Sequence, residues 1–388
     1  MVKRLIVCCD GTWDDADAGG SFSNVVRLSR AIKAKAEDGT EQIVYYQSGV
    51  GTGSDAATKI TGGAIGVGLS RNVRDAYAFL ANNYCDGDQL FLFGFSRGAY
   101  TARSIAGLIG WAGILHKGDM DDFGLLWESF KLRARPGEPL NPSWTDARTN
   151  FPDRHEDVPI ECVGVWDTVG ALGIPGHIGG LFQRFFNFQD TELGVHVKNA
   201  FHALAIDEHR KLYEPTLWHK TAGAPQDQKI EQVWFAGAHA DVGGGYPEHG
   251  LADVTLAWMV GRVSELLEID LDYVKSRQDR RRAWALDQVH NSAAGILGWL
   301  GREHRPVGTT DTETVHASVQ TRIGAGAQAE GGNYAPPNLM AAPVYAPLSA
   351  DEQALQWPQA DAQHPGDTGR PAPLHVHRLL LDLNSGDL

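Results

Sequence analysis

A serine flanked by glycines is the first feature of the sequence that could carry chemistry. Gly94 and Gly98 enclose Ser96 in the pattern Gly-X-Ser-X-Gly. The apolar run 89–95 predicts a buried strand, and the small residues that follow predict a helix over about 98–114. On a tight turn between strand and helix, side chains two residues before or after the serine would collide with it, so glycine fits both positions. The pattern therefore predicts an exposed, nucleophilic Ser96.

A base and an acid for this serine are expected on later strands of the same sheet. A strand predicted over 159–166 leads directly into Asp167, and the next predicted strand, over 230–236, leads to His239. Carboxyl ends of parallel strands meet at one edge of a sheet, and the chain order serine, acid, histidine suits this arrangement. We predict that His239 is the general base and that Asp167 orients it.

Asp241 is a second candidate for the acid. It lies two residues after His239 and directly before the glycines at 243–245, where a carboxylate is better placed to cap or brace the turn. The sequence leaves both carboxylates as candidates and favours Asp167.

The negative charge that develops on an attacked carbonyl oxygen needs backbone N–H donors. One is expected from Arg97, the residue after the nucleophile, and a second from Gly11 or Thr12 in the loop after the first strand. Asp10, which begins that loop, is expected to hold the loop in place and to take no direct part in the chemistry.

Strands and helices alternate along most of the chain. Further strands are expected over 5–9 and 42–47, and further helices over 24–35, 73–84 and 251–267. Apolar strands separated by helices predict an α/β fold with a mostly parallel, doubly wound sheet and right-handed crossovers.

The sequence predicts a catalytic domain over residues 1–270 and a helical and irregular extension over 271–388 that packs on it, with a last strand over 374–383. Two segments within the domain, about 116–158 and 170–193, break the alternation and are expected to form caps over the sheet edge. The second cap holds four phenylalanines, which fit a lid that accepts an acyl chain and an ordinary core under a cap equally well.

The sequence resembles the uncharacterised α/β-hydrolase domain family that includes the catalytic part of one class of type VI secretion lipase effectors. The resemblance covers about residues 3–267 and rests on six stretches in order: Cys9-Asp10-Gly11-Thr12-Trp13, Gly49-Val50-Gly51-Thr52, Gly94-Phe95-Ser96-Arg97-Gly98-Ala99-Tyr100, Val165-Trp166-Asp167-Thr168-Val169-Gly170, Ala203-Leu204-Ala205-Ile206-Asp207-Glu208 with Arg210, and His239-Ala240-Asp241-Val242-Gly243-Gly244-Gly245-Tyr246. It implies an α/β-hydrolase fold and a serine ester hydrolase, with phospholipase activity in some members.

The expected function is therefore cleavage of lipid-like carboxylic esters by a Ser-His-Asp triad through an acyl-enzyme. The expected substrate is a phospholipid or another ester, reached by transient contact with a membrane surface. No cofactor and no metal ion are expected.

Composition narrows the classes of function. The formal net charge of −14 disfavours a nucleic-acid partner, because such a chain repels a phosphate backbone. The apolar run after the first four residues is too short for a signal-peptide core, and no apolar span reaches 18 residues, so a cytoplasmic location is expected, with signal-independent export left open. The four cysteines are expected to be reduced, buried thiols with no disulfide or zinc site.

Two other classes of function are alternatives. A non-enzymatic module could cradle a phosphate in the glycine-rich loop 49–68, but that loop carries no phosphate-loop motif. A metal-dependent phosphohydrolase would leave the two glycines around the serine without a purpose. Its ligands would be the acidic and imidazole side chains at strand ends: Asp10, Asp167, His239 and Asp241.

Overall fold

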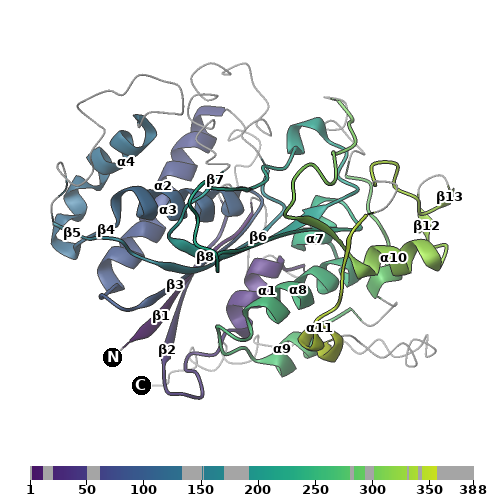
Figure 1. The fold of residues 1–388 in the computed structure, drawn as a ribbon, viewed down its shortest axis with the longest axis horizontal. Helices are drawn as coiled ribbons and strands as arrows, with labels where there is room; N and C mark the ends of the chain where they lie inside the picture. The colour runs from purple at the N-terminus through teal and green to yellow at the C-terminus, as the bar shows by residue number, and fades with distance from the viewer. Residues whose placement is uncertain are drawn as a thin grey trace, which may run out of the picture.

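The fold is built around one eight-stranded sheet (Figure 1). In spatial order the strands are β14-β11-β10-β8-β6-β3-β1-β2, and every ladder between neighbours is parallel. The strands are β1 (Lys3–Cys9), β2 (Glu41–Gln47), β3 (Gln89–Phe95), β6 (Ile160–Trp166), β8 (Val197–Ala205), β10 (Lys229–Phe235), β11 (Glu313–His316) and β14 (Tyr345–Ala346). The computed structural model describes residues 2–11, 21–49, 62–132, 151, 153–169, 192–279, 284–292, 301–329, 332–339 and 343–355.

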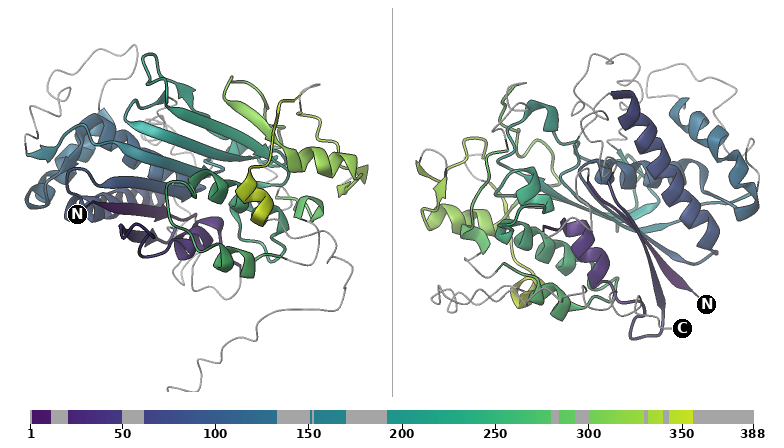
Figure 2. Two further views of the ribbon diagram at one scale, coloured as in Figure 1. Left: turned by 60° about the horizontal axis from the view of Figure 1, so that its bottom comes forward. Right: turned by 180° about the vertical axis from the view of Figure 1, so that it is seen from behind.

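Helices cover both faces of the sheet, as Figures 1 and 2 show. One face carries α2 (Gly62–Asn83), α3 (Arg97–Ala112) and α4 (Phe123–Leu132). The opposite face carries α1 (Asn24–Ala31), α7 (His239–Gly243), α8 (Gly250–Val263), α9 (Leu271–Ser276) and α11 (Ala350–Leu355). The predicted α/β class with a doubly wound parallel sheet is confirmed.

Smaller elements complete the described chain. α10 (Ala317–Gly324) follows β11 and packs beside it. The short strand pairs are β4 (Ile114–Leu115) with β5 (Arg154–His155), β7 (Glu192–Leu193) with β9 (His219–Lys220), and β12 (Gln328–Ala329) with β13 (Gly332–Asn333). The 3-10 helices are η1 (Lys117–Asp122), η3 (Lys211–Tyr213) and η4 (Trp284–Leu286).

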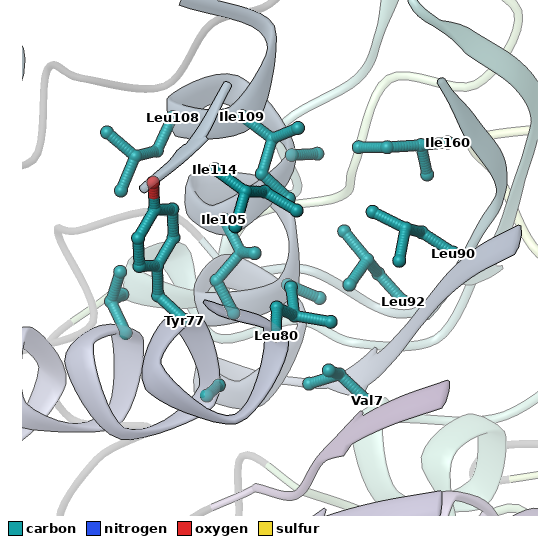
Figure 3. Close-up of a cluster of buried hydrophobic side chains, with 14 of the residues drawn as sticks. Val7, Tyr77, Leu80, Leu90, Leu92, Ile105, Leu108, Ile109, Ile114 and Ile160 are labelled. Carbon is teal, nitrogen blue, oxygen red and sulfur yellow. The ribbon is translucent and has the colours of Figure 1, made fainter. Parts of the chain in front are cut away.

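The central strands are apolar without interruption because both of their faces are buried. In β3, Leu90 and Leu92 pack against α2 and α3, whereas Phe91 and Phe93 pack toward α1 and α8. Figure 3 shows the first of these two cores between the helices and the sheet. A strand with two buried faces shows a continuous apolar run and no alternation, which is the pattern that predicts β1, β3 and β6.

The order of strands corrects one expectation. β8 is not among the predicted strands, and it lies between β6 and β10. The strand that leads to Asp167 is therefore not the neighbour of the strand that leads to His239. β11 and β14 also join the sheet, so part of the segment expected to be helical and irregular adds two strands beyond β10. The division into a catalytic domain and an extension stays a prediction.

Several other expectations concern segments that the structure describes only in part or not at all. Of the cap expected over 116–158, the structure describes residues 116–132, 151 and 153–158. Of the cap expected over 170–193, it describes only residues 192 and 193. The strand expected over 374–383 lies entirely outside the described residues. All four cysteines are free, but Cys85 is exposed, so its expected burial is wrong. None of the described helices is both long enough and apolar enough to cross a membrane.

Candidate active site

Ser96 lies on a sharp turn between β3 and α3. Its backbone has φ 57° and ψ −121°, a region that L-residues rarely adopt. A Cβ at Gly94 would lie 2.4 Å from the carbonyl oxygen of Gly98, and a Cβ at Gly98 would lie 2.1 Å from the carbonyl oxygen of Cys9. Both glycines are therefore required by close backbone approaches, as the sequence pattern predicts.

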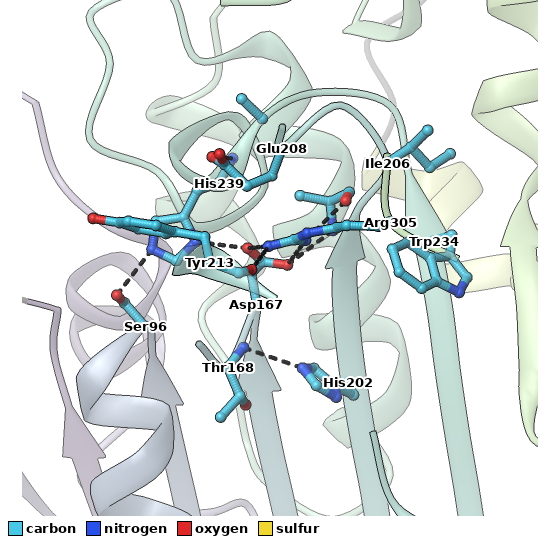
Figure 4. Close-up of polar contacts among 12 residues, drawn as sticks. Ser96, Asp167, Thr168, His202, Ile206, Glu208, Tyr213, Trp234, His239 and Arg305 are labelled. Atoms are coloured by element: carbon cyan, nitrogen blue, oxygen red, sulfur yellow. Dashed lines mark hydrogen bonds and ion pairs between the residues drawn. The ribbon is translucent and has the colours of Figure 1, made fainter. Parts of the chain in front are cut away.

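Ser96, His239 and Asp167 form a continuous chain of hydrogen bonds (Figure 4). His239 Nε2 lies 2.8 Å from Ser96 Oγ, and His239 Nδ1 lies 2.6 Å from Asp167 Oδ2. All three residues are buried, with Ser96 8% and His239 7% exposed and Asp167 fully buried. The structure thus brings together the three residues that the sequence predicts as nucleophile, base and acid.

Backbone hydrogen bonds fix the turns that carry the serine and the acid. The Ser96 N–H donates to the carbonyl of Trp166 at 3.1 Å, and the Asp167 N–H donates to the carbonyl of Ala203 at 2.8 Å. Asp167 also has a positive φ, of 39°. Each strand end therefore holds the loop of its neighbour at the carboxyl edge of the sheet.

Asp167 is saturated with hydrogen-bond donors. Its Oδ1 accepts from the Ala205 N–H at 3.0 Å and from Arg305 Nη1 at 2.6 Å, and its Oδ2 accepts from Arg305 Nη2 at 3.0 Å as well as from His239. Burial alone would raise the pKa of Asp167, but the charge of Arg305 and the hydrogen bond from His239 outweigh burial and hold that pKa well below its usual range. Asp167 is therefore a stable carboxylate.

His239 is enclosed by aromatic and acidic groups. Its ring centroid lies 4.6 Å from that of Phe95 and 5.0 Å from that of Tyr213, which it meets edge-on. Its backbone N–H donates to Glu208 Oε2 at 3.3 Å, and Glu208 is paired with Arg210. Burial opposes ionisation of Glu208, but Arg210 outweighs burial and lowers the pKa of Glu208 to about 2. The beginning of α7 is thus anchored to a permanent anion.

Asp241 has a different partner from His239. Its Oδ1 lies 2.6 Å from His290 Nδ1, and its Oδ2 accepts from the Ala238 N–H at 2.9 Å. It therefore braces the first turn of α7, which is the bracing position expected if Asp167 pairs with the histidine.

The loop after β1 lies against the Ser96 turn, because β1 and β3 are paired with Cys9 opposite Gly94. In this loop the Gly11 N–H donates to Asp10 Oδ1 at 2.7 Å. Asp10 Oδ2 in turn accepts from the hydroxyls of Ser23 and Tyr46. Asp10 holds the loop as expected, the Gly11 N–H already has a partner, and Thr12 lies outside the described residues.

The four residues considered as metal ligands belong to three separate networks. Asp10 binds the loop hydroxyls, Asp241 binds His290, and Asp167 is paired with His239 and Arg305. The described residues contain no group of three or more His, Cys, Asp or Glu side chains arranged to hold a metal ion.

A cavity of about 350 Å³ lies beside α3. Its described lining includes the apolar residues Tyr100, Trp111, Phe130, Leu193 and Trp218, and also the charged or polar residues Arg103, Glu192 and His196. One wall begins a single helical turn after the nucleophile, since the Tyr100 N–H donates to the Ser96 carbonyl at 3.3 Å. The wall at Trp218 follows Thr216, whose N–H donates to the carbonyl of Thr168, the residue after the acid. Ser96, Asp167 and His239 are not among the described lining residues, and the cavity is connected to the site through the turn of α3 that carries Tyr100.

Arg305, Glu208 and Tyr213 are functional neighbours that the sequence reasoning does not assign. Glu208 and Arg210 occur in one of the six resembling stretches, so a signal for them was present. Arg305 precedes β11 in irregular sequence with no recognisable motif, and 138 residues separate it from Asp167. Only the folded chain shows that they meet.

Comparisons with known proteins agree with the resemblance seen in the sequence. Residues 3–262 match the family model described as "T6SS, Phospholipase effector Tle1-like, catalytic domain". The uncharacterized protein YEL023C of Saccharomyces cerevisiae is 29% identical over 227 residues, which are 54% of this chain and 31% of that protein.

Two solved structures are also similar. An uncharacterized protein from Pseudomonas aeruginosa aligns at 17% identity and a TM-score of 0.40, over 70% of this chain and 47% of that chain. The Tle1 effector bound to the VgrG spike of the type 6 secretion system aligns at 19% identity and a TM-score of 0.34, over 63% of this chain and 51% of that chain. The chain thus spans under a third of the yeast protein and about half of each solved chain. Because the family model matches most of its length, the chain belongs to the family of T6SS phospholipase effector Tle1-like catalytic domains.

Proposed function

We propose that this protein is a serine hydrolase that cleaves carboxylic esters of lipids. The observation that carries the proposal is the hydrogen-bond chain from Ser96 Oγ through His239 to Asp167, with a strained serine at a strand-to-helix turn. Membership of a phospholipase effector family supports an ester-hydrolysing enzyme.

The reaction follows from the roles of these side chains. His239 Nε2 removes the proton from Ser96 Oγ as that oxygen attacks the ester carbonyl carbon, and Asp167 stabilises the imidazolium that forms. The tetrahedral intermediate then expels the alcohol, which takes the proton from His239, and an acyl-enzyme remains on Ser96. Water, activated by the same imidazole, attacks the acyl-enzyme and releases the carboxylic acid.

The oxyanion of the intermediate is held by the Arg97 N–H and by a donor in the loop after β1. The Gly11 N–H already donates to Asp10 Oδ1, which favours Thr12 as the second donor. Asp10 then acts by holding the loop against the Ser96 turn.

The cavity beside α3 supports a lipid-like substrate. Its volume of about 350 Å³ lies within the usual range of ligand pockets, and aromatic and aliphatic side chains form much of its described lining. We assign it to the acyl chain, because Tyr100 in its lining lies one helical turn after Ser96. A glycerophospholipid at a membrane surface supplies such an ester.

Replacing Ser96 tests the proposal. The parent and Ser96→Ala are compared on p-nitrophenyl butyrate, p-nitrophenyl laurate and phosphatidylcholine vesicles, each with and without EDTA. We expect Ser96→Ala to lower kcat by about 10⁴-fold or more, and EDTA to leave the parent unchanged.

Ser318→Ala is a matched control. Ser318 Oγ lies 2.8 Å from His316 Nδ1, and His316 Nε2 lies 3.0 Å from Glu352 Oε1, which makes a second chain of hydroxyl, imidazole and carboxylate. Ser318 lies on the regular helix α10, without the strained backbone of Ser96, so the control should keep the parent's rate. Full activity in Ser96→Ala, or loss of activity with EDTA, would overturn the proposal.

A further inference from the structure

Arg305 reaches the candidate acid from a segment outside the family match. Residues 3–262 match the family model, whereas Arg305 lies shortly before β11. Its guanidinium is buried, at 4% exposure, and grips both oxygens of Asp167 with Nη1 and Nη2. A two-pronged contact of this kind fixes the plane of a carboxylate, which a single ammonium group does not do.

Arg305 is itself held in place by two backbone carbonyls. Nη1 also donates to the carbonyl of Ala205 at 2.8 Å, and Nη2 donates to the carbonyl of Tyr213. Ala205 ends β8, the strand between those that lead to the acid and the base, and Tyr213 packs edge-on against His239. One guanidinium therefore links the acid, the intervening strand and the aromatic wall of the base, as Figure 4 shows.

We propose that Arg305 is a positioning residue of the hydrolase, which holds Asp167 in the orientation that pairs with His239, and that the active site is therefore completed by chain beyond the family match. The proposal rests on the proposed function, because it concerns the same acid and base. Arg305 acts through Asp167 and does not touch the reacting atoms.

Arg305 also has an electrostatic consequence that can be measured. Among the described residues, the charged and titratable groups that face His239 are Asp167, Arg305, Glu208 with its partner Arg210, and Tyr213. Removing the cation at Arg305 leaves Asp167 and Glu208 to attract the imidazolium. Because the base must be neutral to accept a proton, the acid limb of kcat/KM should then move to higher pH.

The test compares Arg305→Met and Arg305→Lys with the parent on p-nitrophenyl butyrate across pH. We expect Arg305→Met to lower kcat about 10–100-fold with KM within about twofold, and to move the acid limb to higher pH. Arg305→Lys keeps the positive charge but cannot donate to both oxygens of Asp167 at once. Its kcat should therefore fall, while the acid limb of its pH profile stays near that of the parent.

The control is Arg322→Met, a second buried arginine of the same segment, whose Nη1 donates to the carbonyls of Ala285 and Asp287. It should change stability without moving the pH profile. Indistinguishable profiles for Arg305→Met and Arg322→Met would overturn the proposal.

A double variant keeps the test decisive if Arg305→Met fails to fold. Asp167→Asn with Arg305→Met removes both charges of the buried pair, so neither is left alone. If Arg305 acts through Asp167, the double variant is as active as Asp167→Asn, whereas a double variant with a kcat well below that of Asp167→Asn would contradict the proposal. If Ser96→Ala is inactive and the double variant is well below Asp167→Asn, only the proposed role of Arg305 is refuted. If Ser96→Ala keeps its activity, the proposed hydrolase function is refuted.

Discussion

At the scale of single residues, the site is built from conformations that cost stability. Ser96 and Asp167 are two of the three described non-glycine residues with positive φ. Such conformations cost roughly 1–3 kcal/mol each and persist only where the surroundings fix them. Here the fixing groups are the carbonyls of Trp166 and Ala203, which accept hydrogen bonds from the two strained residues. These hydrogen bonds thus hold the proposed nucleophile and the proposed acid at one edge of the sheet.

Replacing the strained serine by glycine should therefore stabilise the fold relative to alanine. Glycine adopts φ 57° without the Cβ collision, so Ser96→Gly should exceed Ser96→Ala by about 1 kcal/mol in free energy of unfolding. Urea titration of both inactive variants measures the difference. An alanine variant as stable as the glycine variant would show that the turn carries no strain.

The buried carboxyl of Asp10 predicts a pH dependence of stability. Burial raises the pKa of Asp10 to about 6, although hydrogen bonds from Ser23, Tyr46 and Gly11 oppose the rise. A group whose pKa rises on folding holds its proton more tightly in the folded state, so its contribution to stability is lost as pH rises from about 4 through about 6.

Asp10→Asn removes this titration with little change of shape. Between about pH 4 and pH 7 the parent should lose about 2 kcal/mol of unfolding free energy relative to Asp10→Asn. Urea unfolding of both proteins at the two pH values measures the gap. A gap that does not change with pH would contradict the raised pKa.

The residues with local signals are those that the sequence could predict. Ser96 is marked by its two glycines, and Asp167 and His239 follow apolar runs, so their meeting could be expected from the topology of a parallel sheet. The contact between Arg305 and Asp167 could not be predicted, because 138 residues of chain separate the two side chains.

At the scale of elements, apolar runs predict β1, β3, β6 and β10, but they miss β8. That strand carries Asn199 and His202, which break the apolar pattern. Each has a partner in the tertiary fold, since Asn199 donates to the Glu161 carbonyl at 2.8 Å and His202 Nε2 accepts from the Thr168 N–H at 3.2 Å. Burial lowers the pKa of His202 to about 3, which keeps it a neutral acceptor. Polar residues of this kind interrupt the continuous apolar run from which a buried strand is predicted.

The cavity beside α3 leads to a prediction about chain length. A Cβ at Gly107 would lie 3.4 Å from Phe130, so Gly107→Leu should fill part of the cavity without a backbone collision. Each buried methylene contributes about 0.8 kcal/mol, so losing room for two of them should lower the laurate-to-butyrate ratio of kcat/KM roughly tenfold.

Gly124→Leu is the control for this change, because a Cβ at Gly124 meets nothing within 4 Å. It should keep the parent's laurate-to-butyrate ratio. An unchanged ratio in Gly107→Leu as well would place the acyl chain elsewhere.

At the scale of the whole molecule, the sheet extends beyond the family match. β11 adds to β10, and the Trp234 Nε1–H of β10 donates to Glu313 of β11 at 2.7 Å. β11 has four residues and β14 has two. Strands this short show too few residues for a hydrophobic pattern to predict them from the sequence.

The net charge of −14 predicts how activity depends on the lipid surface. An acidic protein is repelled by anionic vesicles, and salt screens this repulsion over roughly 10 Å at 0.1 M. Hydrolysis of phosphatidylcholine vesicles should fall when phosphatidylglycerol is mixed in at low salt, and the deficit should shrink as salt is added. Equal rates on both vesicles at low salt would contradict control by net charge.

Covalent labelling tests the central claim, an activated Ser96, most directly. A fluorophosphonate loses fluoride to an activated serine and leaves a phosphonyl group on its oxygen. Intact mass and peptide mapping should find one adduct, on Ser96, with loss of esterase activity in proportion to labelling. Ser96→Ala should take up no label, and His239→Gln should label far more slowly. An adduct on another residue, or full labelling of Ser96 with undiminished activity, would contradict the account.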